Sequence, residues 1–167
     1  MDDLNLYRYS CYSNGGIPTK KKEGEMRMII DIYNHHISKS VGKIMEKAKY
    51  YGPGKEFPYP EQNADPEIRL KLMDKHGVDI QALSQTTPVL LGFGPDDAAE
   101  ICRVSNTDNY ALCKSYPKRF VNICIVSLLD MKSAMKELER SVNELDCRGV
   151  TIASNHLLVK WKGTRFS

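Results

Sequence analysis

The chain has 167 residues, with 24 Lys and Arg side chains against 21 Asp and Glu, so its charges nearly balance. Hydrophobic residues make up 41% of the chain and charged residues 27%, which excludes intrinsically disordered, collagen-like and coiled-coil proteins. No apolar run approaches the roughly 20 residues that cross a membrane, and the polar start lacks the apolar segment of a signal peptide. We therefore expect one globular domain without a membrane partner.

The excess positive charge lies at the C-terminal end of the sequence. Lys160, Lys162 and Arg165 follow His156 without any acidic residue, and the rest of the chain carries equal numbers of acids and bases. A nucleic-acid interface needs basic residues clustered on one face, so we expect no nucleic-acid partner. The five cysteines are odd in number and form no C-x-x-C pair, which favours reduced thiols in a cytoplasmic protein.

The first third of the chain contains few regular elements. Residues 1–27 show no helical or strand periodicity and predict a loose N-terminal extension. The β-branched run at 28–33 predicts a buried strand, and a weak amphipathic helix follows at 40–49. Residues 50–64 are rich in Gly, Pro and Tyr and predict an irregular loop.

The next helix has clear start and stop signals. Asp65 is a favourable N-cap, Pro66 suits the first helical turn, and Gly77 suits the C-terminal end. Its core-facing stripe is expected to consist of Ile68, Leu72 and Met73. Residues 78–84 then predict the second strand of the domain.

Two further helix and strand pairs follow. A helix begins at Pro95 and stops at Tyr116, and residues 120–126 predict a third strand. Asp130 caps another helix, and residues 149–153 predict a fourth strand. The expected apolar stripes are Ala98, Ile101, Cys102 and Leu112 on the first helix, and Met131, Ala134, Met135, Leu138, Val142 and Leu145 on the second.

Strands and helices therefore alternate, with no hairpin signal between strands. Right-handed crossovers make such a sheet parallel and cover it with helices, which is an α/β fold. An open doubly wound sheet and the first half of a (β/α)8 TIM barrel both begin in this way, and the pattern leaves both open. In either fold, functional side chains are expected at the carboxyl ends of the strands.

The first strand ends with a possible metal-binding pattern. Strand alternation predicts that Asp31, Tyr33 and His35 share one face, so Tyr33 and His35 point the same way. Two imidazoles at such positions form part of a typical metal site, but here only His35 is a histidine. Tyr33 ligates a metal only as a phenolate, and its ordinary pKa near ~10 opposes that form. The alternative is a strand-end histidine that hydrogen-bonds the backbone.

This motif belongs to a longer pattern. In chain order its segments are MIIDIYNHHIS, RLKLMDKHGVDIQALSQTTPVL, YPKRFVNICIVSLLD and MKELERSVNELDCRGVTIASN. Their order and spacing resemble the amidohydrolase superfamily, and within it the branch that contains aminocarboxymuconate-semialdehyde decarboxylase and aromatic-acid decarboxylases. The resemblance covers residues 28–155 and implies the first half of the TIM barrel.

The resemblance also implies a divalent metal, usually zinc, and a small carboxylic acid of aromatic or muconate-like type that is decarboxylated or hydrolysed. The family's first metal-binding histidine falls on Tyr33 and its second on His35, while Asp31 matches a structural aspartate. The family's other ligands come from later strands, so the resemblance implies a chain that is incomplete for catalysis. His76 is explained by its place at a helix end, and His156 lies where the resemblance stops, so neither is expected to replace them.

Residues 156–167 bear no relation to the family pattern and are expected to form a separate basic tail. The abrupt change indicates a shifted reading frame or a truncated gene model, and residues 1–27 have the same explanation. A half barrel leaves two sheet edges open, so we expect an oligomer. The alternative function is a non-catalytic interaction module that pairs with a copy of itself or with another polypeptide. An open-sheet binder of small molecules is disfavoured because Gly-rich phosphate-binding turns are absent after the first two strands.

Overall fold

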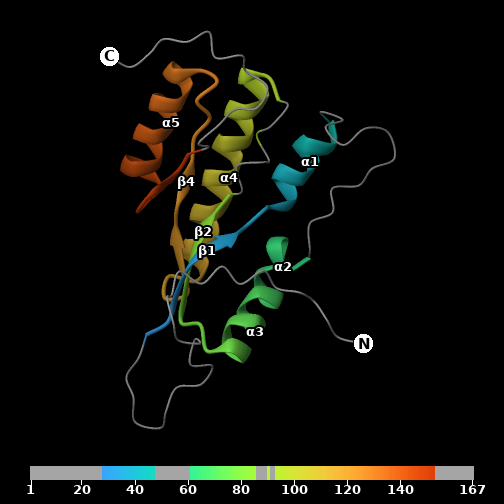
Figure 1. The fold of residues 1–167 in the computed structure, drawn as a ribbon, viewed down its shortest axis with the longest axis vertical. Helices are drawn as coiled ribbons and strands as arrows, with labels where there is room; N and C mark the ends of the chain where they lie inside the picture. The colour runs from blue at the N-terminus through green and yellow to red at the C-terminus, as the bar shows by residue number, and fades with distance from the viewer. Residues whose placement is uncertain (1–27, 48–60, 86–89, 91–92, 153–167) are drawn as a thin grey trace, which may run out of the picture.

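Figure 1 shows the computed structural model of the chain, which describes residues 28–47, 61–85, 90 and 93–152. The extension predicted at 1–27, most of the loop predicted at 50–64, and the tail predicted at 156–167 lie outside these residues. Within the described part of the chain, no helix is long and apolar enough to cross a membrane.

The strands are parallel throughout the described sheets. β1 (Ile30–His35), β2 (Ile80–Ser84) and β3 (Phe120–Asn122) form one sheet in that order, and β4 (Cys124–Ile125) pairs with β5 (Val150–Thr151). The strand predicted at 120–126 is divided because its backbone changes partners at Ile123. The N–H of Ile123 still donates to the Leu83 carbonyl at 3.0 Å, whereas the N–H of Cys124 donates to the Gly149 carbonyl at 2.9 Å.

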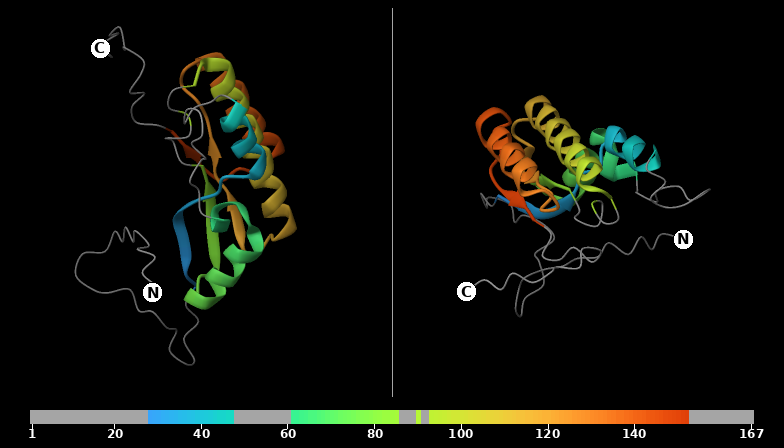
Figure 2. Two further views of the ribbon diagram at one scale, coloured as in Figure 1. Left: turned by 90° about the vertical axis from the view of Figure 1, so that its right-hand side faces the viewer. Right: turned by 90° about the horizontal axis from the view of Figure 1, so that it is seen from above.

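All described helices lie on one side of the strands, and Figure 2 shows this layer edge-on. They are α1 (Lys39–Lys47), α2 (Glu61–Ala64), α3 (Pro66–His76), α4 (Pro95–Ser115) and α5 (Met131–Glu144). The prediction of irregular structure was wrong at residues 61–64, where α2 forms a short turn directly before α3. Among the described residues, the opposite face of the sheet carries no covering element.

Helix α3 begins and ends where the sequence predicts. The Asp65 carboxylate accepts hydrogen bonds from two backbone N–H groups of the first turn, and Gly77 ends the helix in the left-handed region at φ 69°. The expected apolar stripe is wrong in part. Leu72 is 37% exposed, whereas Arg69 is only 5% exposed and faces the sheet together with Met73, because residues four apart share one helix face.

Two apolar clusters fill the space between the sheet and the helices. The first joins α1 and α4 to β4 and contains Ile37, Val41, Met45, Leu90, Phe93, Ala98, Ile101, Cys102 and Ile125; the second joins α3 to β2 and β3 through Met73, Leu83 and Phe120. The predicted core positions Ala98, Ile101 and Cys102 of α4 are confirmed, and Leu112 packs against the second cluster as a partly buried residue.

Helix α4 also buries polar side chains that its apolar pattern did not reveal. Asn106 is fully buried, and its amide Nδ2 donates to the Ile125 carbonyl at 3.0 Å while its Oδ1 accepts from the Ile125 N–H at 2.8 Å. The same Nδ2 donates to Glu137 Oε1 of α5 at 2.8 Å. One asparagine therefore fixes the end of β4 and links two helices.

Helix α5 is capped as predicted, since the Asp130 carboxylate accepts from the Ser133 N–H at 3.0 Å. Its predicted apolar stripe is wrong in part: Ala134 and Leu145 are buried, whereas Met131, Met135 and Val142 are each more than half exposed. The helix side chains that are buried are small, namely Ala134 and Ser141. Small residues bring α5 close to its neighbours over a narrow contact, and the wider apolar stripe extends beyond it.

Candidate metal site at the end of the first strand

An extra residue in β1 determines which of its side chains face the helices. The register pairs Asp31 with Gln81 and Asn34 with Leu83, so three steps along β1 match two along β2. Gln81 and Leu83 share one face of β2, and their partners Asp31 and Asn34 therefore share that face also. The prediction that Asp31 lies on the face of Tyr33 and His35 is wrong, because this bulge reverses the alternation.

Tyr33 and His35 lie together on the face that no described helix covers. Their ring centroids are 5.0 Å apart with an interplanar angle of 70°, an edge-to-face contact. Tyr33 is 67% exposed, and His35 is partly buried. The structure thus brings together the two residues that the sequence singled out for metal binding.

Asp31 has a structural place, as the sequence predicted. Its carboxylate accepts a hydrogen bond from Gln81 Nε2 at 3.0 Å and another from the Tyr33 N–H at 3.1 Å. These bonds hold the bulged backbone of β1 and join it to β2. The carboxylate is therefore occupied on the helix-facing side of the strand, opposite the His35 ring.

Arg69 is the main support of this strand end. Its Nη2 donates to the His35 carbonyl at 2.7 Å, and its Nη1 donates to Asn34 Oδ1 at 2.9 Å and Gln81 Oε1 at 3.1 Å. Burial lowers the pKa of Arg69 to about 10, so the guanidinium remains charged at neutral pH. Sequence reasoning missed this residue, although an arginine four positions before the buried Met73 was a usable signal.

The surroundings of His35 favour its neutral form. Burial lowers the pKa of His35, the Arg69 charge lowers it further, and the Asp31 carboxylate acts in the opposite direction. The Ser84 hydroxyl lies 3.5 Å from His35 Nδ1 and donates to the Asn34 carbonyl at 2.8 Å. A neutral imidazole is the form that binds a metal ion.

The donor set nevertheless supplies only part of a metal centre. A catalytic zinc site typically has three protein ligands and an open position. In the residues that the structure describes, no group of three or more His, Cys, Asp or Glu side chains is placed to hold a metal ion. His35 suits one coordination position, and the chain as described does not fit a complete centre.

The neighbouring histidine has a different place. His36 is buried, its N–H donates to the Ser84 carbonyl at 2.8 Å, and its Nδ1 lies 2.7 Å from Asn109 Oδ1. Because the amide oxygen is an acceptor, Nδ1 carries the proton. Burial lowers the pKa of His36, so this ring is a neutral link between the end of β1 and α4. Neither His36 nor Asn109 was predicted. His76 is exposed at the end of α3, as its sequence position suggested, and His156 lies outside the described residues.

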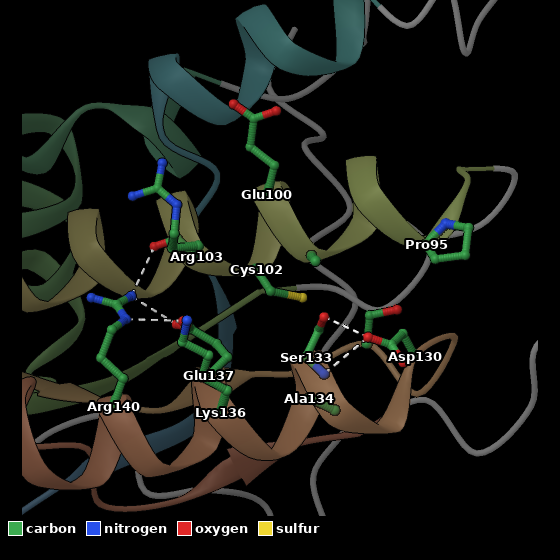
Figure 3. A pocket seen from close by; sticks show the side chains of 12 residues that line it. Pro95, Glu100, Cys102, Arg103, Asp130, Ser133, Ala134, Lys136, Glu137 and Arg140 are labelled. Carbon is green, nitrogen blue, oxygen red and sulfur yellow. Dashed lines mark hydrogen bonds and ion pairs between the residues drawn. The ribbon is translucent and has the colours of Figure 1, made fainter.

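A hollow of about 380 Å³ lies between α4 and α5, on the helix side of the sheet (Figure 3). Two of its charged side chains form an ion pair, with Arg140 Nη2 2.7 Å from Glu137 Oε1, and Asp130 caps its own helix. Because the hollow lies on the helix side, the sheet separates it from Tyr33 and His35, which lie on the uncovered face. We do not assign it to the candidate metal site.

Residues 30–167 match the amidohydrolase family. The chain belongs to this family. The matched region includes residues 156–167, for which the sequence predicted no resemblance, and the domain boundary at 155 stays a prediction.

Several proteins similar to this amidohydrolase chain are decarboxylases. The 2-amino-3-carboxymuconate-6-semialdehyde decarboxylase of Dictyostelium discoideum is 30% identical over 145 residues, which cover 75% of this chain and 40% of that protein. The crystal structure of 2,6-dihydroxybenzoate decarboxylase complexed with 2,6-dihydroxybenzoate is 29% identical, with a TM-score of 0.59 over 76% of this chain and 39% of that one. The dihydroxybenzoic acid decarboxylase of Polaromonas sp. JS666, with bound manganese and the inhibitor 2-nitroresorcinol, is 27% identical, with a TM-score of 0.61 over 76% and 38%.

These similarities confirm the predicted fold class: the parallel strands and their helices correspond to part of a TIM barrel. The chain spans about two fifths of the length of these relatives. Divalent metal binding is a property of family members, and manganese is the metal in the neighbour described above.

Proposed function

We propose that this chain forms the opening part of a metal-dependent decarboxylase or hydrolase that acts on an aromatic or muconate-like carboxylic acid. The observation that carries the proposal is the position of His35: Arg69 holds its carbonyl at the carboxyl end of β1, and its ring lies beside Tyr33 on the uncovered face of the sheet. In parallel α/β folds this end of the strands is where chemistry is located. Membership of the amidohydrolase family supports the same assignment.

In this proposal His35 binds a divalent cation as a single ligand, with the Tyr33 phenol as a weak second contact. The sequence resemblance suggests zinc, and the similar decarboxylase structure contains manganese. Such an ion supplies Lewis-acid chemistry when it is bound. The chain's own residues position the imidazole and keep it neutral.

The proposal also states that the chain by itself is incomplete for catalysis. One imidazole and one phenol do not hold a catalytic metal firmly, because such sites typically have three protein ligands. The remaining ligands would come from polypeptide that corresponds to the part of the relatives this chain does not span. We place the protein in the cytoplasm on its cysteine usage.

Metal titration of the purified chain tests the role of His35. We expect weak Mn²⁺ or Zn²⁺ binding by isothermal titration calorimetry, loss of that binding in H35A, and no change in the matched control H76A, because His76 is exposed at a helix end. Unchanged binding in H35A would contradict the assignment of His35.

A decarboxylation assay tests the claim of incompleteness separately. With 2,6-dihydroxybenzoate and added Mn²⁺, we expect no release of CO₂ above the metal-only control. Turnover that depends on His35, together with one tightly bound metal per chain, would show that the site is complete and would overturn this part of the proposal.

A second candidate function is assembly through the sheet edges. Ile32 on β1 is 78% exposed and Val150 on β5 is 41% exposed, so an outer strand of each of the two described sheets carries an uncovered apolar side chain. We propose that these edges pair with a second copy of the chain. Size-exclusion chromatography with light scattering is expected to show a dimer that I32K disrupts and that the exposed-site control K71A leaves intact; a monomeric wild-type chain would contradict it.

A further inference from the structure

Two cysteines meet where the chain passes from α5 to β5. Cys124 lies in β4 and is fully buried, and Cys147 lies in the connecting segment and is partly exposed. The Cys124 N–H donates to Cys147 Sγ at 3.0 Å, and Cys147 Sγ donates to the Gly149 carbonyl at 2.8 Å. The Cys124 side chain is itself hydrogen-bonded to the Cys147 sulfur. The two thiols are therefore direct neighbours, although 23 positions separate them in sequence.

The backbone holds these residues side by side. The Arg148 N–H donates to the Asn122 carbonyl at 2.9 Å, and the Cys124 N–H donates to the Gly149 carbonyl at 2.9 Å. The bonds flank the cysteine pair on both sides, so the connecting segment runs along the strand that carries Cys124. The pairing of the thiols is thus a property of the folded chain.

The pKa values of the two thiols are shifted in opposite directions. The hydrogen bond from the Cys124 side chain is the main cause that lowers the pKa of Cys147, and burial and the Asp146 carboxylate oppose it. The same hydrogen bond and burial raise the pKa of Cys124. Cys147 is therefore the thiol that ionises first, and Cys124 keeps its proton.

The other two described cysteines, Cys102 and Cys113, have pKa values that are shifted upward. Burial is the main cause that raises the pKa of Cys102 and of Cys113 to about 12, so both remain protonated at neutral pH. Since the thiolate is the reactive form of cysteine, these two residues serve as internal controls.

We propose that Cys147 and Cys124 form a reversible oxidation site for hydrogen peroxide. The Cys147 thiolate attacks one peroxide oxygen, the O–O bond breaks, and hydroxide leaves, so that Cys147 becomes a sulfenic acid. The Cys124 sulfur then attacks the Cys147 sulfur, the S–O bond breaks, and the hydroxyl group leaves with the Cys124 proton as water. Two electrons pass from the two thiols to the peroxide, and a disulfide remains.

The disulfide would join β4 to the segment that precedes β5. These strands are only two residues long each, and their pairing rests on a few backbone bonds. Oxidation would therefore add a covalent link at the outer edge of the described sheet, and a thiol reductant would remove it. The site is independent of the metal-binding role proposed for His35.

Peptide mapping of the full chain tests the proposal. A C11S background removes the cysteine that lies outside the described residues. After hydrogen peroxide treatment, alkylation and trypsin digestion, Cys124 is carried by peptide 120–132 and Cys147 by peptide 141–148, so their disulfide gives one linked species. We expect this species after oxidation and its loss after dithiothreitol.

Three variants separate the roles of the cysteines. C124S is expected to leave Cys147 as a sulfenic acid that dimedone traps, C147S is expected to abolish oxidation at Cys124, and C113S is expected to leave the linked peptide unchanged. In the reduced wild-type chain, iodoacetamide is expected to label Cys147 about tenfold faster than Cys113 at neutral pH.

The opposite results would overturn the proposal. Equal labelling rates for Cys147 and Cys113, oxidation of Cys102 or Cys113 before Cys147, or disulfides that form only between chains on a non-reducing gel would each exclude a paired site. A circular dichroism spectrum of each variant, matched to that of the wild type, shows that the comparison is made on folded protein.

Discussion

The two outer regions of the described sheet are stabilised in different ways. At β1, the buried Arg69 of α3 bonds the backbone carbonyl of His35 and two side-chain amides, so the strand end depends on one charged residue. At β4 and β5, α5 contributes small buried side chains and leaves Met135 and Val142 more than half exposed. At the first region a buried charged side chain orders the strand end, whereas at the second the covering helix buries only small side chains and leaves an apolar stripe exposed.

The largest effect is expected from removal of the charged support at β1. R69M keeps the length of the side chain but leaves the carbonyl of His35 and the amide oxygens of Asn34 and Gln81 without their donor. We expect a loss of about 3 kcal/mol in the free energy of unfolding, measured by urea denaturation. K71A, two positions along α3 and exposed, is the control and should change stability by less than about 0.5 kcal/mol. A loss in R69M as small as in K71A would show that this region does not depend on Arg69.

A smaller effect is expected from the asparagine that fixes β4. N106A leaves the N–H and carbonyl of Ile125 unpaired in the buried interior, and each unsatisfied polar group costs about 1–3 kcal/mol. We expect a loss of about 2 kcal/mol in the same denaturation experiment. Asn143 on α5 is exposed, so N143A is the matched control and should leave the midpoint unchanged. Equal midpoints for both variants would contradict the role of Asn106.

The smallest effect is expected on the exposed stripe of α5. M135Q places a polar side chain at a position that is 58% exposed, so we expect less than about 0.5 kcal/mol change in stability. The adjacent A134Q introduces bulk at a buried position and is expected to cost about 1–3 kcal/mol. Chemical denaturation of both variants compares the free energy of unfolding after a change at a buried position and at an exposed position of the same helix. A large loss in M135Q would mean that this stripe is covered in solution.

The sequence was sufficient for those parts of the fold that depend on local signals. Asp65, Gly77 and Asp130 were predicted as helix caps because capping depends on a few neighbouring backbone groups, and all three are confirmed. The parallel order of strands followed from their alternation with helices. The pairing of Tyr33 with His35 followed from alternation over two residues, which the bulge does not interrupt.

The features that were missed depend on contacts between distant segments. The division of the strand at 120–126 results from a change of partner, which no local pattern records. Arg69, Asn106 and Asn109 are polar residues on faces that hydropathy marks as apolar, and their burial is possible only because backbone groups of other elements satisfy them. The wrong face predicted for Asp31 has the same origin, because the register between β1 and β2 depends on both strands.

The additional residue in β1 has a consequence for how this strand tolerates change. Before it, even-numbered positions point away from the helices; after it, they point toward them. The face on which a substituted side chain lies therefore depends on whether its position precedes or follows the bulge. Deleting Ile32 would join the halves into one uninterrupted alternation, in which Asp31 still faces the helices and the His35 ring still faces the open side.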